Sequence, residues 1–309
     1  HPNLRGKTMS EKRQHFLQEF DWVRKALMFE PRGHDMMSGA FLYPPCSNNA
    51  DASILFIETS GCLPMCGHGT IGTITAAIES GLLIAKAPGK LIIDVPAGQI
   101  NIDYQQTGGK VDWVKIYNVA AYLAHQDQIL DISGLGVLKV DVSYGGNYYV
   151  IVDPQENFPG LRHWSAGDIL KWSPIVRKVA QEQLTCIHPD DPTVNGVSHV
   201  LWTGDTINDG SNGANAVFYG DKAIDRSPCG TGTSARMAQL FTKGLLHVGD
   251  EYTHESIIGS QFIGRVEAVT TVGPHQAIMP SIKGWARIIG KNAITVDDSD
   301  PYAYGFQVV

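Results

Sequence analysis

The 309-residue sequence lacks several features that mark whole classes of protein. It has no apolar run of the length that a membrane-spanning helix needs, and it does not open with a signal peptide. It also lacks an excess of positive charge, since 24 Lys and Arg stand against 31 Asp and Glu, for a net charge of −7. These absences argue against binding to nucleic acid or to an anionic membrane and leave a small molecule as the expected partner.

Cysteine is scarce, and its five copies are an odd number, which is not the pattern of a secreted disulfide framework. Free thiols in a reducing cytoplasm fit this count, so we expect a cytoplasmic protein. A free cysteine is usually a small apolar core residue, and the question is which of the five do more. They are Cys46, Cys62, Cys66, Cys186 and Cys229.

The sequence also lacks the marks of a cofactor enzyme. It has no cluster of residues at metal-ligand spacing, no phosphate-binding loop and no dinucleotide fingerprint. Nothing marks a Schiff-base lysine with a phosphate cup, as a pyridoxal enzyme would need. We therefore expect neither a metal nor a cofactor.

What the sequence does contain is an internal repeat. Residues 66–70 read C-G-H-G-T, and residues 229–233 read C-G-T-G-T. Fifteen residues after each cysteine comes a glycine, Gly81 or Gly244, followed by two leucines. Two segments that share a motif and a downstream spacing predict two copies of one structural unit.

Each copy predicts a glycine turn that leads into a helix. Apolar residues recur at helical spacing after both motifs. Thr70 or Thr233 is a candidate for the residue that caps the helix start, and Gly81 and Gly244 stand where a left-handed residue ends a helix.

Short strand-like runs dominate the rest of the chain, which favours an α+β fold over alternating βαβ units. A boundary near residues 132–138 would leave one repeat in each half. Strands are expected at residues 54–57, 91–95, 111–117, 137–142, 148–152, 216–219 and 287–289, and further helices at 11–29 and 168–183.

A cysteine at a helix N-terminus suits proton transfer at carbon. The helix dipole and the unpaired backbone N–H groups stabilise a thiolate, and the same groups bind a carboxylate. The glycines of both motifs permit close backbone approach. Two such helix ends facing one another would hold an amino-acid carboxylate with one thiol on each side of its Cα. A thiolate would then remove the proton from one face while a thiol donates one to the other.

Two segments resemble the signatures of the proline racemase family: M-C-G-H-G-T-I-G at 65–72 and D-R-S-P-C-G-T-G-T-S-A-R at 225–236. The resemblance extends from about Arg5 to Phe306. Family members usually carry an opening strand before the position of Asn3, so we expect residues to precede His1 in the natural protein. Supporting matches are E-P-R-G-H at 30–34, V-P-A-G at 95–98, Y-G-G-N at 144–147, E-S-I-I-G-S at 255–260 and D-P at 300–301.

The resemblance implies a diaminopimelate-epimerase-like α+β fold. Two pseudo-symmetric halves would each wrap a β-sheet around a central helix, with the active site in the cleft between them. The first half would be residues 1–134 with Cys66, completed by a C-terminal strand at about 292–309. The second half would be residues 135–291 with Cys229.

The resemblance also implies a cofactor-independent two-base epimerase in which Cys66 and Cys229 are catalytic. The favoured reaction interconverts trans-4-hydroxy-L-proline and cis-4-hydroxy-D-proline. The Gly-Thr pair after His68 is similar to members that act on 4-hydroxyproline. A small polar Ser38 leaves room for a ring hydroxyl, and His199 is placed to hydrogen-bond with it.

Substrate contacts follow from the same resemblance, with Asp225 meeting the ring nitrogen. The alternative for Asp225 is a carboxylate that only supports its own turn. Arg32 and His34 are expected to hold structure, and Tyr219 to wall the ring or fill the core. The expected substrate-binding residues are Gly67, His68, Asp225, Gly230, Thr231, His199 and Ser38, with no metal ligand.

Other functions stay open at this point. The nearest is a proline racemase. A 3-hydroxyproline dehydratase is disfavoured, because such family members replace one of the two cysteines with Ser or Thr. A thiol redox protein would use Cys66 and Cys229 as a disulfide pair, and a binding module would use the motifs without catalysis. A homodimer is left open as the assembly.

Overall fold

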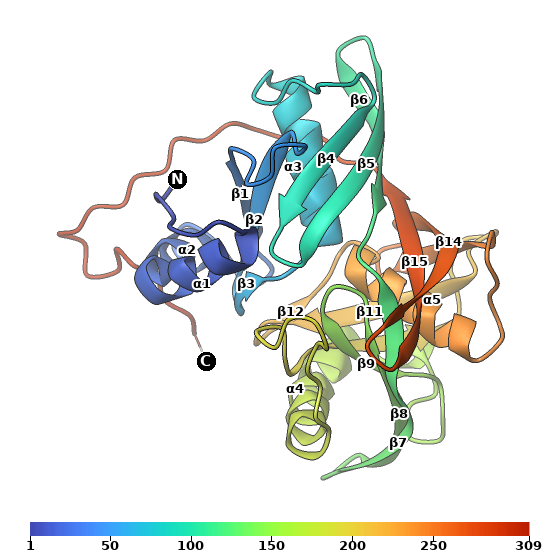
Figure 1. Cartoon of the computed structure of the whole chain (residues 1–309). Coiled ribbons are helices and arrows are strands. Elements are labelled where there is room, and N and C mark those ends of the chain that lie inside the picture. Colours follow the sequence, from blue (N-terminus) through green and yellow to red (C-terminus); the bar gives the residue numbers. More distant parts are fainter. Residues whose placement is uncertain (309) are drawn as a thin grey trace. The chain divides into compact units, whose positions relative to one another are not determined.

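The computed structural model describes residues 1–308 of the chain, which forms two compact units (Figure 1). Unit 1 comprises His1–Ile116 and the segment from Trp285 onward, and unit 2 comprises Tyr117–Gly284. The two motif cysteines lie in different units, so each unit contains one copy of the repeat.

The chain divides earlier than the sequence pattern suggests. β7 (Ala121–Ile132) belongs to unit 2 rather than to a first half over 1–134, because it pairs with β8 (Gly136–Tyr144) and with β15 (His275–Gly284). The second division follows β15 directly, instead of lying near residue 291. The pairing of β7 with β15 joins strands far apart in sequence, and no local signal marks it.

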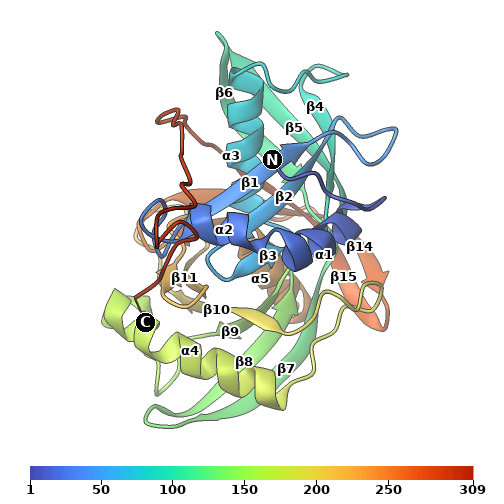
Figure 2. The ribbon, with the colours of Figure 1, turned by 90° about the vertical axis from the view of Figure 1, so that its left-hand side faces the viewer.

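Unit 1 is a mixed sheet with helices on both faces (Figures 1 and 2). Its strands follow the order β1-β2-β4-β5-β6, with β3 paired to β2. β2 runs antiparallel to β1 and parallel to β4. The elements are α1 (Met9–Glu19), α2 (Asp21–Met28), β1 (Ser38–Tyr43), β2 (Ala52–Glu58), β3 (Gly61–Leu63), α3 (Gly67–Glu79), β4 (Lys90–Val95), β5 (Gly98–Thr107) and β6 (Lys110–Tyr117).

Successive side chains of β2 point to opposite faces of the sheet, and helices cover both faces. Leu55 and Ile57 pack with Phe16 of α1 in one apolar cluster. Phe56 points to the other face, where its ring approaches Gly69 of α3. Every residue of β2 is buried, and residues 54–57 form a continuous apolar run within it.

The single helix expected over residues 11–29 is two helices, α1 and α2, that meet at Phe20. Phe20 leaves the helical conformation, with φ −127° and ψ 9°. Asp21 begins α2 and forms an ion pair with Arg24 at 2.6 Å. An acidic residue in a first turn complements the helix dipole, so Asp21 stabilises a new helix start.

The segment after β15 joins unit 1, but its described part, residues 285–308, does not contain the strand expected at about 292–309. Arg32 holds this segment, as its guanidinium donates hydrogen bonds to the carbonyls of Tyr302 (3.1 Å) and Ala303. Arg32 thus has the structural role that the sequence predicted.

The strand expected at 287–289 is also irregular. The side chain of Ile289 is fully exposed, so no burial stabilises an extended pairing there. Arg287 instead donates a hydrogen bond of 3.1 Å to the carbonyl of Val111.

Unit 2 is a closed ring of strands in the order β15-β14-β13-β11-β10-β9-β8-β7, and β15 closes it by pairing with β7. The pairs β9–β10 and β11–β13 are parallel. β12 pairs with β11 outside this ring. The remaining elements are β9 (Tyr148–Val152), a 3₁₀ turn (Leu161–His163), α4 (Ala166–Gln183), β10 (Val197–Gly204), β11 (Gly213–Tyr219), β12 (Ala223–Ile224), α5 (Gly230–Thr242), β13 (Glu251–Ser256) and β14 (Gln261–Val272).

One helix lies inside this ring and the other covers its outside (Figures 1 and 2). α5 contacts β7, β8 and β9 as well as β14 and β15, so strands surround it. α4, which confirms the helix expected over 168–183, packs Ile169 and Val176 against Trp202 on the outer face. The indole N–H of Trp202 donates to the hydroxyl of Ser173 at 2.8 Å, which satisfies a buried polar atom.

The two repeat copies form the same element, as predicted. α3 and α5 each contain 13 residues, and each is followed by a glycine at positive φ, +68° at Gly81 and +72° at Gly244. Among residues 1–308, none of the helices combines the length and the apolar character that crossing a bilayer requires.

Candidate active site

Cys66 is the N-cap residue of α3, in extended conformation with φ −143°. The first backbone hydrogen bond of the helix joins the N–H of Thr70 to the carbonyl of Cys66 at 3.0 Å. The N–H groups of Gly67 and His68 precede that bond and have no partner within the helix. Thr70 is therefore not the cap that the sequence suggested, because its hydroxyl donates back to Cys66 instead.

Cys229 is the N-cap residue of α5, and its backbone differs from that of Cys66. Its φ is +58° and its ψ is 102°, a backbone conformation that residues other than glycine rarely adopt. The first helical bond runs from the N–H of Thr233 to the carbonyl of Cys229 at 2.7 Å. The N–H groups of Gly230 and Thr231 thus have no acceptor within the helix, as at the start of α3.

The second glycine of each motif makes room for the thiol. A Cβ on Gly69 would lie 3.0 Å from Sγ of Cys66, and a Cβ on Gly232 would lie 3.1 Å from Sγ of Cys229. Each sulfur therefore lies over the first turn of its own helix, beside the N–H groups. This placement explains why both motifs read C-G-x-G.

The turn before Cys229 is held by hydrogen bonds from several directions. The N–H of Ser227 donates to Oδ1 of Asp225 at 2.8 Å, and the N–H of Cys229 donates to Oγ of Ser227 at 3.1 Å. The amide of Asn215 donates to the carbonyl of Pro228 at 2.8 Å. Asp225 thus stabilises the turn that carries the cysteine, and its predicted contact with a substrate nitrogen stays a prediction.

A buried histidine supports the same turn. His254 of β13 has no exposed surface, its Nδ1 lies 2.9 Å from the hydroxyl of Thr233, and its ring lies 3.0 Å from the amide of Asn215. Burial, with a further contribution from the charge of Arg236, lowers the pKa of His254 to about 3. His254 is therefore neutral at physiological pH and acts as a fixed hydrogen-bonding group.

Tyr149 of β9 is a site residue that the sequence prediction missed. Its hydroxyl lies 3.3 Å from Sγ of Cys229 and 2.5 Å from the hydroxyl of Thr231, and its side chain is fully buried. Asn147 also reaches the Thr231 hydroxyl, at 3.4 Å. The Y-G-G-N motif, combined with the two-residue period of a strand, would have indicated that Tyr149 shares the face of Asn147.

Gly145, in the same motif, lets this strand end approach α5. A Cβ there would lie 2.2 Å from the carbonyl oxygen of Thr231 and 2.6 Å from the nitrogen of Ala235. No side chain fits in that space, so the close approach requires glycine.

His199 of β10 is brought to the Cys229 side of the candidate site. Its ring packs on Tyr149 at 4.7 Å between centroids and stacks near Tyr219 at 6.4 Å. Its Nδ1 lies 2.6 Å from the hydroxyl of Ser198. Unit 2 therefore gathers Cys229, Thr231 and His199 with the additional Tyr149.

Ser38 begins β1 of unit 1, and β1 packs against α3, whose first residue follows Cys66. The hydroxyl oxygen of Ser38 is buried and has no hydrogen-bond partner among the described residues. A buried polar atom without a partner is uncommon and calls for an explanation, such as a ligand that completes it.

Two of the remaining cysteines, Cys62 and Cys186, are buried, whereas Cys46 is partly exposed and packs against the apolar cluster around Phe16. Burial raises the pKa of Cys62 to about 12 and that of Cys186 to about 11, so both are thiols at physiological pH. In the described part of the chain, no three His, Cys, Asp or Glu side chains come together as a metal site would require.

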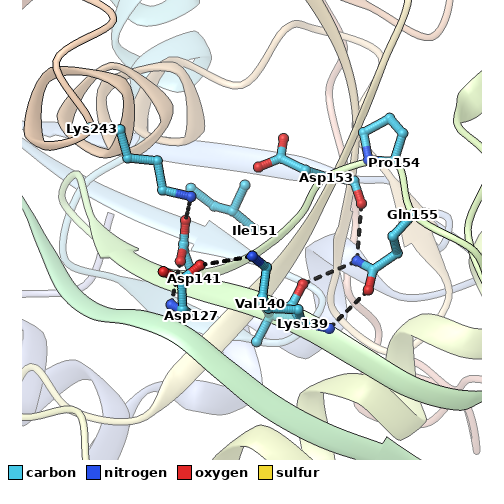
Figure 3. Close-up of a pocket in the computed structure, with 9 residues that line it drawn as sticks. All are labelled: Asp127, Lys139, Val140, Asp141, Ile151, Asp153, Pro154, Gln155 and Lys243. Atoms are coloured by element: carbon cyan, nitrogen blue, oxygen red, sulfur yellow. Dashed lines mark hydrogen bonds and ion pairs between the residues drawn. The ribbon is translucent and has the colours of Figure 1, made fainter.

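A cavity of about 80 Å³ lies at the far end of α5 from Cys229, beside Lys243 (Figure 3). Its charged residues are already paired, Lys243 with Asp141 and Lys139 with Asp127. The 13 residues of α5 put it about 20 Å from the cysteine, so we do not regard it as the substrate site.

Comparisons with known proteins agree over nearly the whole chain. A family profile described as "Proline racemase" matches residues 1–307. A relative from Shewanella loihica, named "4-hydroxyproline 2-epimerase", is 82% identical over 309 residues, which cover 100% of this chain and 93% of the relative.

Two solved structures are similar to this one in fold and, more weakly, in sequence. A probable proline racemase from Agrobacterium radiobacter, with bound carbonate, has a TM-score of 0.91 at 28% identity, covering 100% of this chain and 91% of that one. A hydroxyproline epimerase from Agrobacterium vitis, with bound trans-4-hydroxy-L-proline, has a TM-score of 0.90 at 27% identity, covering 99% and 89%. These matches confirm the expected diaminopimelate-epimerase-like α+β fold.

Proposed function

Because this chain belongs to the proline racemase family, we propose that it interconverts trans-4-hydroxy-L-proline and cis-4-hydroxy-D-proline. The observation that carries the proposal is the pair of cysteine-capped helices, α3 with Cys66 and α5 with Cys229. Inverting a stereocentre by proton transfer needs a base on one face of Cα and an acid on the other, and this pair supplies both.

The reaction moves two protons without any net change. The thiolate of one cysteine takes the Cα proton, so that the C–H bond breaks, an S–H bond forms and the electron pair is delocalised into the carboxylate. The thiol of the other cysteine then donates its proton to the opposite face of Cα. The roles of Cys66 and Cys229 are exchanged after each turnover, and the reverse reaction restores them.

The helix N-termini stabilise the charge that develops during this transfer. The N–H groups of Gly67 and His68 on α3, and of Gly230 and Thr231 on α5, are suited to bind the substrate carboxylate. As the Cα proton leaves, negative charge grows on the carboxylate oxygens, and donors fixed in advance stabilise that charge most. Asp225 is proposed to accept a hydrogen bond from the ring nitrogen.

The preference for a hydroxylated ring rests on Ser38 and His199. The buried hydroxyl of Ser38 has no partner among the described residues, and a ring hydroxyl would supply one. A site that hydrogen-bonds a substrate hydroxyl discriminates strongly against a ring without it, because polar groups are then left unpaired. The alternative substrate is proline, for which Ser38 offers no advantage.

The test is proton NMR in deuterated buffer with trans-4-hydroxy-L-proline, L-proline and trans-3-hydroxy-L-proline offered separately. The expected result is loss of the Cα proton signal and formation of the cis-D product from the first substrate alone. Cys66→Ser and Cys229→Ser should each abolish inversion, whereas the matched control Cys186→Ser, a buried cysteine outside the motifs, should retain it.

Other outcomes separate the alternatives. Exchange from proline but not from 4-hydroxyproline would indicate a proline racemase and contradict the roles of Ser38 and His199. Loss of water from the 3-hydroxy substrate would indicate a dehydratase. If no substrate exchanges its Cα proton, the isomerase proposal fails and a thiol redox role becomes the better hypothesis. A cytoplasmic location is part of the proposal, since the mechanism needs both thiols reduced.

A further inference from the structure

We propose that Tyr149 is a catalytic residue on the Cys229 side, where its hydroxyl donates a hydrogen bond to the Cys229 thiolate and turns to Thr231 once the sulfur is protonated. This inference deepens the function proposed above and rests on it for the identity of the reaction. The hydrogen bond itself is tested independently of any substrate.

Three groups with exchangeable protons, two hydroxyls and one thiol, lie within hydrogen-bonding range of one another. Oη of Tyr149 lies 3.3 Å from Sγ of Cys229 and 2.5 Å from Oγ1 of Thr231, while Sγ and Oγ1 are 3.9 Å apart. The tyrosine hydroxyl has a single proton, so at any moment it can donate to the sulfur or to Thr231 but not to both. Its choice therefore depends on the protonation state of Cys229.

The fold fixes the Tyr149 ring in this position. Tyr149 lies in β9, paired with Ser143 of β8 on one side and with His199 of β10 on the other. Its side chain has no exposed surface, and the His199 ring packs against it at an interplanar angle of 31°. A hydroxyl held in advance is a stronger donor to a developing charge than one that must be ordered during the reaction.

The proton count shows what Tyr149 does during turnover. While Cys229 is a thiolate, Tyr149 donates to the sulfur and accepts from the hydroxyl of Thr231. When the sulfur takes the Cα proton, its need for a donor falls, and Tyr149 donates to Thr231 instead. Tyr149 gains and loses no proton overall, because only the acceptor of its hydrogen bond changes. Hydrogen bonding to the charged form of an acid favours that form, so Tyr149 favours the thiolate.

Other titratable groups contact the residues around Cys229. His199 of β10 packs on Tyr149, and Tyr219 of β11 stacks near His199. Asp225 after β12 accepts from the N–H of Ser227, and His254 of β13 contacts Thr233. His254 stays neutral over the working pH range because burial holds its pKa near 3. Every variant described below retains these four groups, so their effect on the pKa of Cys229 is the same in the proteins that are compared.

The first experiment measures the thiolate of Cys229 directly. In a Cys66→Ser background, iodoacetamide alkylation of Cys229 is followed against pH by peptide mass spectrometry, which distinguishes it from the other cysteines. Only the thiolate reacts appreciably, so the rate reports its population. Tyr149→Phe is expected to move the midpoint of this profile about one pH unit to the alkaline side, the effect of losing one hydrogen bond to a charged group.

A matched control lies next to Tyr149 on the same strand. The hydroxyl of Tyr148 is bonded at 2.7 Å to that of Tyr122, in the outer core that α4 covers. Tyr148→Phe removes the same atom from the opposite face of β9 and should leave the alkylation midpoint unchanged. An unchanged midpoint in Tyr149→Phe, or an equal shift in both variants, would overturn the proposal.

A second measurement covers the case in which Tyr149→Phe does not fold. Replacement of all tyrosines by 3-fluorotyrosine keeps every hydroxyl but makes it a stronger donor. The midpoint of Cys229 alkylation should then move to the acid side, and no acid shift would count against the proposed hydrogen bond.

The second experiment asks whether the hydrogen bond affects catalysis. In the chain with both motif cysteines, Tyr149→Phe should lower kcat/KM at neutral pH about tenfold, with the pH profile displaced to the alkaline side by the same unit. The loss should be equal in both directions, since the equilibrium constant of the reaction is fixed. A shifted alkylation midpoint with unchanged kcat/KM would refute the catalytic role. If the wild-type chain exchanges no Cα proton at all, the proposed function fails, while the alkylation experiment still decides the hydrogen bond.

Discussion

The positive φ of Cys229 predicts that two similar motifs respond in opposite ways to the same substitutions. Cys229 has φ +58°, whereas Cys66, at the equivalent position of the repeat, has φ −143°. A left-handed backbone costs a residue with a Cβ about 1–2 kcal/mol. Glycine escapes that cost but loses about 0.5–1 kcal/mol more conformational entropy on folding than alanine does.

These magnitudes decide whether the glycine or the alanine variant is the more stable at each position. At position 229 the relief of strain exceeds the entropy cost, so Cys229→Gly should be more stable than Cys229→Ala by about 0.5–1 kcal/mol. At position 66 there is no strain to relieve, so Cys66→Gly should be less stable than Cys66→Ala by about the same amount. Both variants in each comparison lack the thiol, so the packing contribution of the thiol cancels.

The assay is urea unfolding of the four variants, analysed for the unit that carries each substitution. Thermal melting gives a second reading, since 1 kcal/mol corresponds to about 2–4 °C for domains of about 150–250 residues. The result that would refute the reasoning is a glycine variant less stable than the alanine variant at both positions. The backbone of Cys229 would then store no strain that the side chain causes.

Two further predictions follow from contacts in unit 2. Gly145→Ala should destabilise the fold by about 1–3 kcal/mol, with loss of activity, because the new Cβ would meet the carbonyl of Thr231 at 2.2 Å; an unfolding midpoint equal to that of wild type would contradict this. Burial would raise the pKa of Glu255, but hydrogen bonds, chiefly from Asn208 and Ile207, outweigh it, and the pKa lies below its ordinary value of 4.5. Glu255 therefore contributes stability above about pH 4.5 that is lost as the pH falls, so the gap in unfolding free energy between wild type and Glu255→Gln should narrow on acidification. A gap that stays constant from pH 7 to pH 3 would contradict the assignment.

The sequence was most informative where structure depends on nearby residues. The repeat predicted α3 and α5 because the C-G-x-G turn, the apolar spacing and the closing glycine all act within one helix. It misassigned the caps, since Thr70 and Thr233 are typical capping residues, yet the cysteines occupy the cap positions. Gly69 and Gly232 leave space for the sulfur of the preceding cysteine, and this role becomes apparent only when the position of the sulfur is known.

Features that depend on distant pairing were beyond the sequence pattern. The division of the chain before β7 depends on its pairing with β15, more than 150 residues later. Tyr149 was missed because an apolar strand reads as core on both faces, and only the ring closure shows that one face meets α5. Whether Cys66 and Cys229 act on one substrate also stays a prediction until Cα exchange is measured.

The contact of the segment after β15 with Arg32 has a consequence for the order in which the two units fold. Unit 2 is one continuous stretch of chain, whereas unit 1 needs residues from both ends. During synthesis the ribosome therefore releases all of unit 2 before the residues that complete unit 1, such as Tyr302 and Ala303, have emerged. Domains usually fold in the order of their synthesis, but here unit 2 can be finished first. The surface of α2 at Trp22 is covered only after Tyr304, which packs against it, has been synthesised.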